Sequence, residues 1–343
     1  MTMKSLNAVD LFSGCGGLSC GMQKAGFHIK VAIDNDVDAC RTFKINHPET
    51  EIINEDIRNI DTHKIKEIMG FQQLHLLAGC PPCQGFSTIR KLNKRKSFRD
   101  NRNKLIWEYF RFVEELKPLT IMMENVPGLT GYYLFKDFIV KLRELGYLLK
   151  YNVVDIKNYS VPQRRKRVVL IGSLLGKLDI APASHEKITV QHAIGNLESI
   201  ESTSDPLHRT RTTHTERIKR LISLIPKDGG SRQDLPTEYR LKCHNKPNVG
   251  FNDIYGRLSW NDYSTTITGG CLNPSKGRFL HPQEDRVITA REAALLQSFP
   301  MDYIFPTDIS KASLASLIGN ALPPKFSYIQ CKNIKAHLDK YLD

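Results

Sequence analysis

The first predicted strand of the chain ends in the stretch Asp10-Leu11-Phe12-Ser13-Gly14-Cys15-Gly16-Gly17. The apolar run from Ala8 to Phe12 predicts that strand, and the pattern from Leu18 to Ala25 predicts a helix directly after the glycines. Glycines between a strand and a helix let the backbone turn tightly and approach a ligand closely. The third glycine of the dinucleotide fingerprint is absent, because Ser19 stands in its place. The turn therefore suits a cofactor that has no pyrophosphate.

The alternation of apolar runs with helical patterns continues through the first half of the chain. Amphipathic patterns at Lys104 to Glu115 and Phe135 to Leu145 predict helices between strands. This order predicts an α/β fold with a mostly parallel sheet that helices cover on both faces. Such sheets bind ligands outside the carboxyl ends of their strands. The further strand runs are Ile29–Ile33, Glu51–Ile53, His75–Ala78, Thr120–Met123, Leu148–Val154 and Val168–Ile171.

The character of the sequence changes near residue 175. Residues 181–263 are richer in Pro, Gly, Ser, Thr and His and show weak periodicity, which is typical of a smaller, irregular domain. Helical patterns return at Thr289–Gln297 and Lys325–Leu342. We therefore expect a first domain at 1–175, a smaller second domain at 176–310, and a C-terminal segment at 311–343 that returns to the first domain.

The charge of the chain is strongly positive. Its 343 residues include 49 Lys and Arg against 36 Asp and Glu, a formal net charge of +13. Such a balance favours a polyanionic partner, first nucleic acid and second an anionic membrane, over a uniformly solvated basic surface. The apolar runs are too short for a membrane span, and the N-terminal residues lack the apolar core of a secretory signal. We therefore expect no membrane partner and a cytoplasmic location.

The eight cysteines do not predict a disulfide framework or a metal site. They are unevenly spaced, and Cys80-Pro-Pro-Cys83 has no second Cys-x-x-Cys partner. The histidines show no paired ligand spacing, so we expect no metal.

A second informative stretch, Gly79-Cys80-Pro81-Pro82-Cys83-Gln84-Gly85-Phe86-Ser87, follows an apolar strand. Its two prolines stiffen the backbone ahead of Cys83 and place the sulfur at the carboxyl edge of the sheet. A single cysteine is more often a small buried hydrophobe. The Pro-Pro-Cys-Gln context instead favours a nucleophile, whose thiolate form nearby cations would stabilise.

Taken together, these stretches make the chain resemble the cytosine-5 DNA methyltransferases of the compact bacterial restriction–modification type. The resemblance runs through nearly the whole chain in order. It implies a Rossmann-like, S-adenosylmethionine-dependent methyltransferase domain at 1–175 and an irregular DNA target-recognition domain at 176–310. The matching motifs are Asp10–Gly17, Asp34, Asp56, Pro81–Ser87, Asp100–Leu105, Glu124–Val126, Gln163–Arg167, Arg291–Ala294, Leu296–Pro300 and Gly319–Pro324.

The residue types suit this chemistry. Cytosine C5 is a poor nucleophile, and addition of a thiolate at C6 makes the ring enamine-like, which is covalent catalysis. We assign the nucleophile to Cys83. Glu124, which follows the strand Thr120–Met123, could neutralise the charge that builds at N3 if burial raises the pKa of its carboxyl. Taken by themselves, Glu124 and Asn125 could instead cap a helix or a turn.

Two arginines match the Gln-x-Arg-x-Arg pattern of the family. For Arg165 and Arg167 the resemblance implies contacts with the cytosine carbonyl and with the active-site loop. Arg164 and Lys166 would point the other way along a strand, toward solvent or phosphate.

The implied cofactor is S-adenosylmethionine, with S-adenosylhomocysteine as product and no metal. Asp34 ends the second strand, where a carboxylate can accept hydrogen bonds from ribose hydroxyls. It is shorter than the Glu more usual in the family, and Asn35 replaces an often larger apolar residue, which puts the adenine stacking in doubt. The implied cofactor residues are Phe12, Gly14, Gly16, Asp34 for the ribose, Asp56 for the adenine, Pro82, Leu105 and Asn320.

The implied partner is double-stranded DNA, bound by a monomer. Residues 90–104 hold eight basic side chains against Asp100 alone and resemble the mobile loop that closes over DNA. Residues 205–246 add ten basic against five acidic side chains. Both clusters suit phosphate contacts, and the target base must leave the helix. The implied DNA contacts are Gln84, Ser87, Arg90, Lys91 and Arg99.

Alternatives remain at this stage. A transferase of the same chemistry could act on tRNA, and a chain of this fold could be a catalytically silent DNA-binding regulator. The Cys83 stretch and residues 175–285, which are free to read DNA, favour duplex DNA. We expect a modification enzyme paired with a restriction endonuclease, associated with the nucleoid if bacterial. The recognised base sequence does not follow, since Arg257–Trp260 and Thr265–Thr268 resemble either the flanks of recognition loops or core strands.

Overall fold

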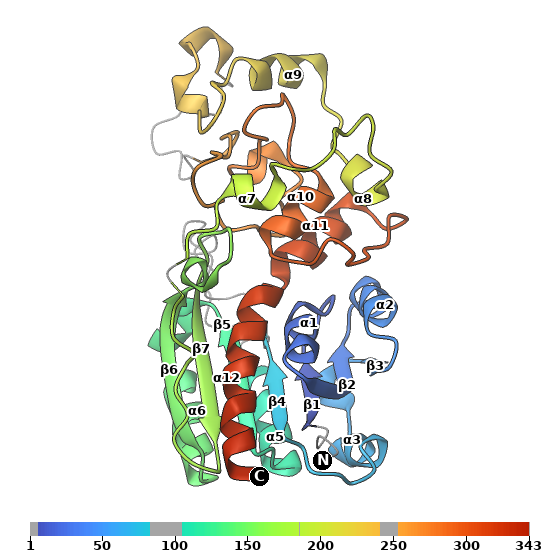
Figure 1. Cartoon of the computed structure of the whole chain (residues 1–343), viewed down its shortest axis with the longest axis vertical. Coiled ribbons are helices and arrows are strands. Elements are labelled where there is room, and N and C mark those ends of the chain that lie inside the picture. Colours follow the sequence, from blue (N-terminus) through green and yellow to red (C-terminus); the bar gives the residue numbers. More distant parts are fainter. Residues whose placement is uncertain (1–5, 83–104, 185, 241–252, 343) are drawn as a thin grey trace. The chain divides into compact units, whose positions relative to one another are not determined.

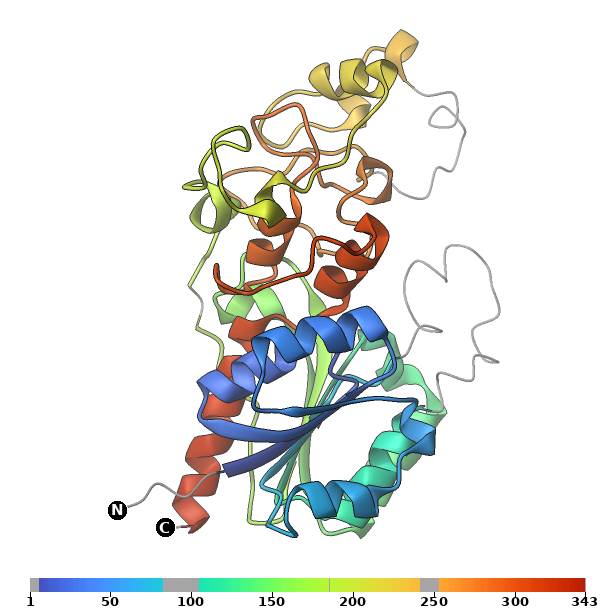
Figure 2. The ribbon, with the colours of Figure 1, turned by 90° about the vertical axis from the view of Figure 1, so that its right-hand side faces the viewer.

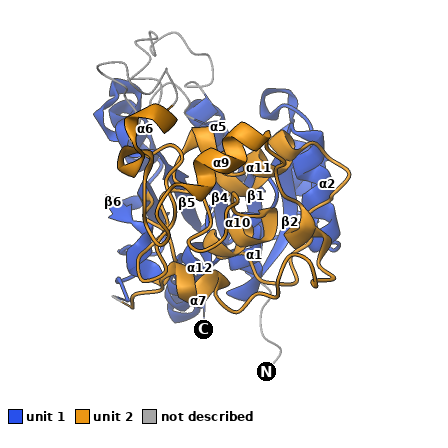
Figure 3. Ribbon diagram, turned by 90° about the horizontal axis from the view of Figure 1, so that it is seen from above, with its two compact units in different colours: residues 1–159, 166–184, 322–343 blue, residues 160–165, 185–321 orange. Residues whose placement is uncertain are grey.

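The computed structural model describes residues 6–82, 105–184, 186–240 and 253–342 (Figure 1). These residues form two compact units, which Figure 3 colours separately. Unit 1 comprises residues 1–159, 166–184 and 322–343, and unit 2 comprises residues 160–165 and 185–321. Among the described residues, no helix combines the length and the apolar character needed to cross a membrane.

Unit 1 contains a seven-stranded sheet in the order β3-β2-β1-β4-β5-β7-β6. The first five strands along the chain pair in parallel, and β7 pairs antiparallel with both β5 and β6. The order of the strands reverses direction at β1, which lies between β2 and β4. The carboxyl edge of the sheet at β1 is therefore the topological switch point. The strands are β1 Leu6–Leu11, β2 Phe27–Asp34, β3 Glu51–Asn54, β4 Leu76–Gly79, β5 Thr120–Asn125, β6 Leu148–Asp155 and β7 Lys166–Ser173.

Helices cover both faces of this sheet, α1 and α12 on one and α3, α5 and α6 on the other (Figure 2). Every residue of β1 and β5 is buried, as expected for central strands of a two-sided sheet. These helices and strands confirm the α/β fold with a mostly parallel sheet. The helices of unit 1 are α1 Gly17–Lys24, α2 Val37–Asn46, α3 Thr62–Ile68, α5 Leu105–Leu116, α6 Tyr133–Glu144 and α12 Pro324–Leu342.

The helix α12 packs closely on α1. The Ser327 hydroxyl donates a hydrogen bond of 2.7 Å to the carbonyl of Leu18. A Cβ atom added to Gly21 would lie 2.4 Å from Ser327 Oγ and from the backbone nitrogen of Tyr328. Only glycine therefore allows α1 and α12 to approach this closely.

Unit 2 holds short helices joined by irregular segments. Its described residues form isolated bridges, among them a parallel bridge between Gln163 and Ser264. The helix α10 packs against α7, α8 and α11. The helices are α7 Val190–Ile194, α8 Pro206–Arg209, α9 Glu216–Ser223, α10 Ala290–Leu296 and α11 Lys311–Asn320.

The boundaries of the two units differ from those expected at 175/176 and 310/311. Residues 176–184 stay with unit 1, because the Ala181 N–H donates to Gln330 Oε1 and its carbonyl accepts from the Tyr159 hydroxyl. The helix α11 packs on α10 and so stays with unit 2. Residues 160–165 also join unit 2, since the Arg164 N–H donates to the Ser264 carbonyl.

Candidate active site

The glycine-rich turn after β1 lies at the carboxyl edge of the sheet. Its backbone is left-handed at Phe12 (φ 59°), Gly14 (φ 54°) and Gly16 (φ 93°), which is uncommon for a residue with a Cβ. The Ser13 N–H donates to the carbonyl of Ile33 at 3.0 Å and fastens the turn to the end of β2. A Cβ added to Gly14 would meet no atom within 4 Å, so this face of the turn is open.

The carboxylate of Asp34 lies against this turn. Asp34 Oδ2 accepts the N–H of Gly14 at 2.8 Å, and its Oδ1 accepts the N–H of Asp36 at 2.9 Å. Burial raises the pKa of Asp34, although the backbone donors oppose that change. The structure thus brings together two residues that the sequence assigned to the cofactor, Gly14 and Asp34, at the switch point of the sheet.

The other residues assigned to the cofactor have more varied surroundings. Phe12 and Leu105 are half-buried and pack on the core of unit 1. Asp56 caps a short turn, and the Arg58 guanidinium holds the pKa of its carboxyl at about 2. Asp56 is therefore an ionised acceptor that Arg58 partly occupies, with a 2.5 Å ion pair.

Pro82 and Asn320 stand apart from that group. Pro82 is half-buried and is the last described residue before a gap. Asn320 ends α11 in unit 2, where its Nδ2 donates to Ser316 Oγ at 2.9 Å.

The end of β5 carries the most buried charged pair of unit 1. Glu124 is 7% exposed, and its Oε1 lies 2.7 Å from Nε of Arg167 on the neighbouring strand β7. The two side chains lie on the same face of the sheet, because Glu124 pairs with Val169 and Arg167 is two residues from Val169 along β7. Sequence reasoning named both residues, and the structure brings them together.

The next residue of β5 connects this pair to the Pro-Pro-Cys stretch. Asn125 Nδ2 donates a 2.8 Å hydrogen bond to the carbonyl of Pro81, in buried surroundings. Pro81 precedes Cys83 by two residues, so the bond fixes the start of the stretch beside the end of β5. Cys83 itself and the assigned DNA contacts Gln84, Ser87, Arg90, Lys91 and Arg99 lie outside the described residues.

Arg165 has a different environment from Arg167. It is 4% exposed and belongs to unit 2, where its Nη1 donates to the carbonyls of Ile267 at 3.0 Å and Gly319 at 3.1 Å. Arg164, expected to face solvent or phosphate, has a side chain that is 53% exposed, and its Nη2 donates to both carboxylate oxygens of Asp262 at 2.7 Å.

Two buried glutamines, to which the sequence analysis gave no role, extend the network of Arg165. The Nε2 of Gln163 donates to Oε1 of Gln297, and its Oε1 accepts the N–H of Ile267 at 3.0 Å. The Nε2 of Gln297 donates to the carbonyl of Ile318 at 2.7 Å. Both glutamines belong to motifs quoted from the sequence, but only their zero exposure identifies them as a structural centre of unit 2.

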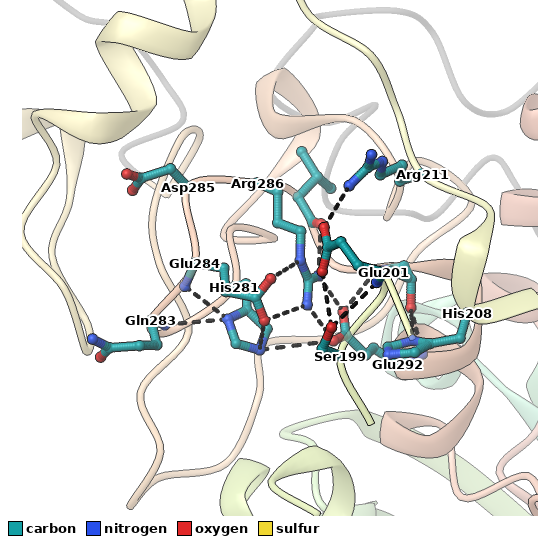
Figure 4. A network of polar contacts seen from close by, with 12 residues as sticks. Ser199, Glu201, His208, Arg211, His281, Gln283, Glu284, Asp285, Arg286 and Glu292 are labelled. Carbon is teal, nitrogen blue, oxygen red and sulfur yellow. Dashed lines mark hydrogen bonds and ion pairs between the residues drawn. The ribbon is translucent and has the colours of Figure 1, made fainter. Parts of the chain in front are cut away.

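A further polar network in unit 2 surrounds the start of α10 (Figure 4). Glu292 accepts the N–H of Thr289 at 2.7 Å and both Nη atoms of Arg286 at 2.8 Å. Arg286 also binds Glu284, at 2.7 and 2.9 Å. Beside them, burial lowers the pKa of His281 to about 4, so this ring is neutral at pH 7. The network fastens α10 to the segment 281–286, which is a structural role for the Arg-Glu-Ala-Ala motif.

Together, a doubly wound sheet with an open glycine turn and a carboxylate at its switch point defines a Rossmann-like enzyme domain. Beside it, the buried Glu124–Arg167 pair supplies groups for acid–base or electrostatic work. Across the ranges that the structure describes, no group of three or more His, Cys, Asp or Glu side chains could hold a metal ion.

Comparisons with known proteins identify the family. The family of C-5 cytosine-specific DNA methylases matches residues 6–336. The Type II methylase M.HgiDII of Herpetosiphon aurantiacus is 34% identical, covering 96% of this chain and 95% of its own length. The Type II methyltransferase M1.HphI of Haemophilus parahaemolyticus is 31% identical, with 93% and 84% covered.

A solved structure agrees with these relatives. The crystal structure of a candidate DNA modification methyltransferase encoded within a prophage of E. coli superimposes with a TM-score of 0.72 at 28% identity, covering 98% of this chain and all of that one. The chain belongs to the C-5 cytosine-specific DNA methylase family, and the resemblance seen in its sequence is confirmed. It is a DNA cytosine-5-methyltransferase.

Proposed function

We propose that the protein transfers a methyl group from S-adenosylmethionine to C5 of a cytosine in a specific duplex sequence, through addition of Cys83 to C6 of a flipped-out base. The observation that carries this proposal is the Asn125–Pro81 hydrogen bond, because it ties the Cys83 stretch to the strand end that bears Glu124.

The residues around Gly14 fit the proposed cofactor. The open face of Gly14 leaves room for a ligand, and Asp34 uses one hydrogen bond per oxygen, which leaves lone pairs for ribose hydroxyls. Phe12 and Leu105 offer half-buried apolar surface for an adenine ring. When bound, S-adenosylmethionine supplies an electrophilic methyl group.

The proposed reaction uses Cys83 as nucleophile and Glu124 with Arg167 as support. The Cys83 sulfur forms a bond to C6, and the displaced electron pair makes C5 nucleophilic toward the methyl group. Glu124, which Arg167 holds in place, gives a proton to N3 and so balances the negative charge that builds on the ring; N3 returns this proton when the thiolate is restored. Once the C5–methyl bond has formed, the C5 proton leaves to a base, and the C6–S bond breaks to restore the thiolate.

We further propose that the protein is the modification enzyme of a restriction–modification system. Its relatives are named as Type II methylases and methyltransferases, and its net charge of +13 suits a DNA partner. A functional pairing with a restriction endonuclease, monomeric action on DNA and a cytoplasmic location belong to the same proposal.

The test compares substrates and a nucleophile variant. The protein is incubated with tritiated S-adenosylmethionine and either duplex DNA or tRNA, with Cys83→Ser in parallel. We expect label in cytosine of DNA only and none with Cys83→Ser. Methylation of tRNA alone, or full activity of the variant, would overturn the proposal.

Trapping isolates the covalent step. Duplex DNA with 5-fluorocytosine at the target should give an adduct that survives denaturation, because fluorine cannot leave C5 as a proton does. Bisulfite sequencing of methylated DNA supplies the target position for that duplex. If a correctly placed 5-fluorocytosine yields no adduct, the thiolate mechanism is wrong.

A further inference from the structure

Among residues 205–240, which the structure describes, the basic side chains include two groups with different surroundings. Several have their charge balanced or are buried within unit 2. Arg211 lies 3.5 Å from Glu201, Lys219 lies 2.7 Å from Glu216, and Lys227 pairs with Asp285. Arg232 is buried. These residues are engaged within the unit and have less charge to offer a partner.

The second group gathers at one cleft beside α9. Arg217, Arg220 and Arg240 line it together with Tyr239, and we call it the α9 cleft. Within the part of the chain that the structure describes, none of these three arginines forms an ion pair with a carboxylate. This distinguishes them from arginines elsewhere in unit 2 that carboxylates neutralise, namely Arg164, Arg211, Arg257, Arg278, Arg286 and Arg291.

Two of the three guanidinium groups are held in place. Arg240 donates to the carbonyls of Leu235 at 2.9 Å and Gln233 at 2.8 Å. Arg220 lies over the ring of Tyr239, with 5.4 Å between its Cζ and the ring centroid. Such anchoring lowers the entropy that a long side chain loses when it binds a partner.

The cleft keeps an excess of positive charge. Its carboxylates are Glu216 and Glu238. Lys219 neutralises Glu216, so the three arginines stand against Glu238 alone. Guanidinium groups that protein carboxylates leave free bind phosphate oxygens through two parallel N–H bonds.

We propose that the α9 cleft binds backbone phosphates of duplex DNA, through Arg217 and Arg220, and positions the duplex without reading its bases. This rests on the proposed function, because it assumes that DNA is the substrate. It adds a binding site that the catalytic residues do not define.

The test is the salt dependence of DNA binding. The full-length protein and Arg217→Gln/Arg220→Gln are titrated with a fluorescent duplex between 0.05 and 0.5 M NaCl. Each phosphate contact contributes about 0.9 to the slope of log K against log salt. Loss of two contacts should make the slope shallower by about 1.8. At 0.1 M salt, taken relative to 1 M, this weakens binding roughly 60-fold. Arg217→Lys/Arg220→Lys, which keeps the charges, should retain most of the slope.

Two controls separate this site from general charge. Arg211→Gln/Lys227→Gln removes the same charge from side chains that are already paired with carboxylates outside the α9 cleft, so its slope should stay near that of the wild type. An unchanged slope in the Arg217/Arg220 variant, or an equal loss in this control, overturns the proposal. Methyl transfer by the wild type distinguishes the two proposals, because its absence there would count against the proposed function and not against the α9 cleft.

The source of the phosphate is tested by competition. Inorganic phosphate is added to the duplex complex at constant ionic strength. A site built for the DNA backbone should release no more duplex than chloride does. Displacement that occurs in the wild type but not in Arg217→Gln/Arg220→Gln would show a site for free phosphate and overturn the DNA assignment.

Discussion

Asp10→Asn should stabilise the protein at pH 8 and remove part of its pH dependence. Asp10 lies in β1 and is fully buried. Its Oδ2 accepts the Ser19 hydroxyl at 2.6 Å, while its Oδ1 accepts no hydrogen bond from any residue that the structure describes. A carboxylate in such a position has lost water without full replacement. Asparagine keeps the shape and the acceptor for Ser19 but carries no charge.

The magnitude follows from the pKa of Asp10. Burial, the largest cause, raises this pKa from 3.8 to about 7. Between these values the folded protein holds a proton that the unfolded chain has released, so the free energy of unfolding falls as pH rises. The contribution of Asp10 is complete below about pH 4 and lost above about pH 7. At about 1.4 kcal/mol per pH unit, the loss amounts to roughly 4 kcal/mol.

The assay is urea unfolding of wild type and Asp10→Asn at pH 5, 6, 7 and 8. His47 and His281, whose pKa values burial lowers to about 4, make the free energy of unfolding change with pH in the opposite direction below pH 6.5. Both proteins contain these histidines, so the difference between their free energies of unfolding isolates Asp10. Asp56→Asn is the matched control, since the low pKa of Asp56 leaves it ionised throughout this range. The reasoning fails if the advantage of Asp10→Asn does not grow between pH 5 and 8.

Three further perturbations test other parts of the structure. Arg286→Met should lower the free energy of unfolding in urea by about 3–5 kcal/mol, because Glu292, with a side chain 2% exposed, loses its partner. The double variant Arg286→Met/Glu292→Met should recover part of that loss, and an equal loss in the double variant would refute this account. Gln297→Met should lower the free energy of unfolding by about 1–3 kcal/mol, because the Ile318 carbonyl loses a donor. The same variant should slow the formation of the adduct with 5-fluorocytosine DNA. Gln330→Met, which changes another fully buried glutamine, is the control and should slow it less. Glu124→Gln should lower the single-turnover rate by about 10²–10⁴ with DNA affinity nearly unchanged, and a rate within tenfold of the wild type would remove Glu124 from the chemistry.

The central strands of the sheet could be predicted from the sequence because they are buried on both faces. The run Val168–Ile171, for example, is apolar throughout and lies within β7. Strand direction is not encoded in an apolar run, so the antiparallel β7 could not be predicted. The bounds of the two units are likewise not encoded locally, because they depend on single contacts such as that of Ala181 with Gln330.

The site was predictable where short motifs fix a local backbone, and less so where distant segments meet. Gly14 and Asp34 stand at strand ends that a parallel sheet must bring to one edge. Glu124 and Arg167 were each named by their own motif, but they meet across the antiparallel pair β5–β7, which no local motif encodes. The partners of Arg165 lie more than 100 residues away in sequence, at Ile267 and Gly319. No local sequence pattern predicts such contacts. Arg165 was therefore assigned to the cytosine carbonyl and the active-site loop on resemblance alone. That assignment, like those of Cys83 and the DNA contacts, stays a prediction.

The close contact between α1 and α12 affects how the chain can fold during synthesis. Leu18 and Met22 of α1 are buried in the finished protein, and the Leu18 carbonyl receives its bond from Ser327, which is made 309 residues later. A ribosome that adds about 5–20 residues per second needs roughly 15–60 s to cover that distance. During this interval unit 2 emerges complete, while α1 still lacks the helix that covers it. The nascent chain therefore carries an uncovered apolar helix for most of its synthesis, and chaperones that bind apolar segments have the longest access to this part of the protein.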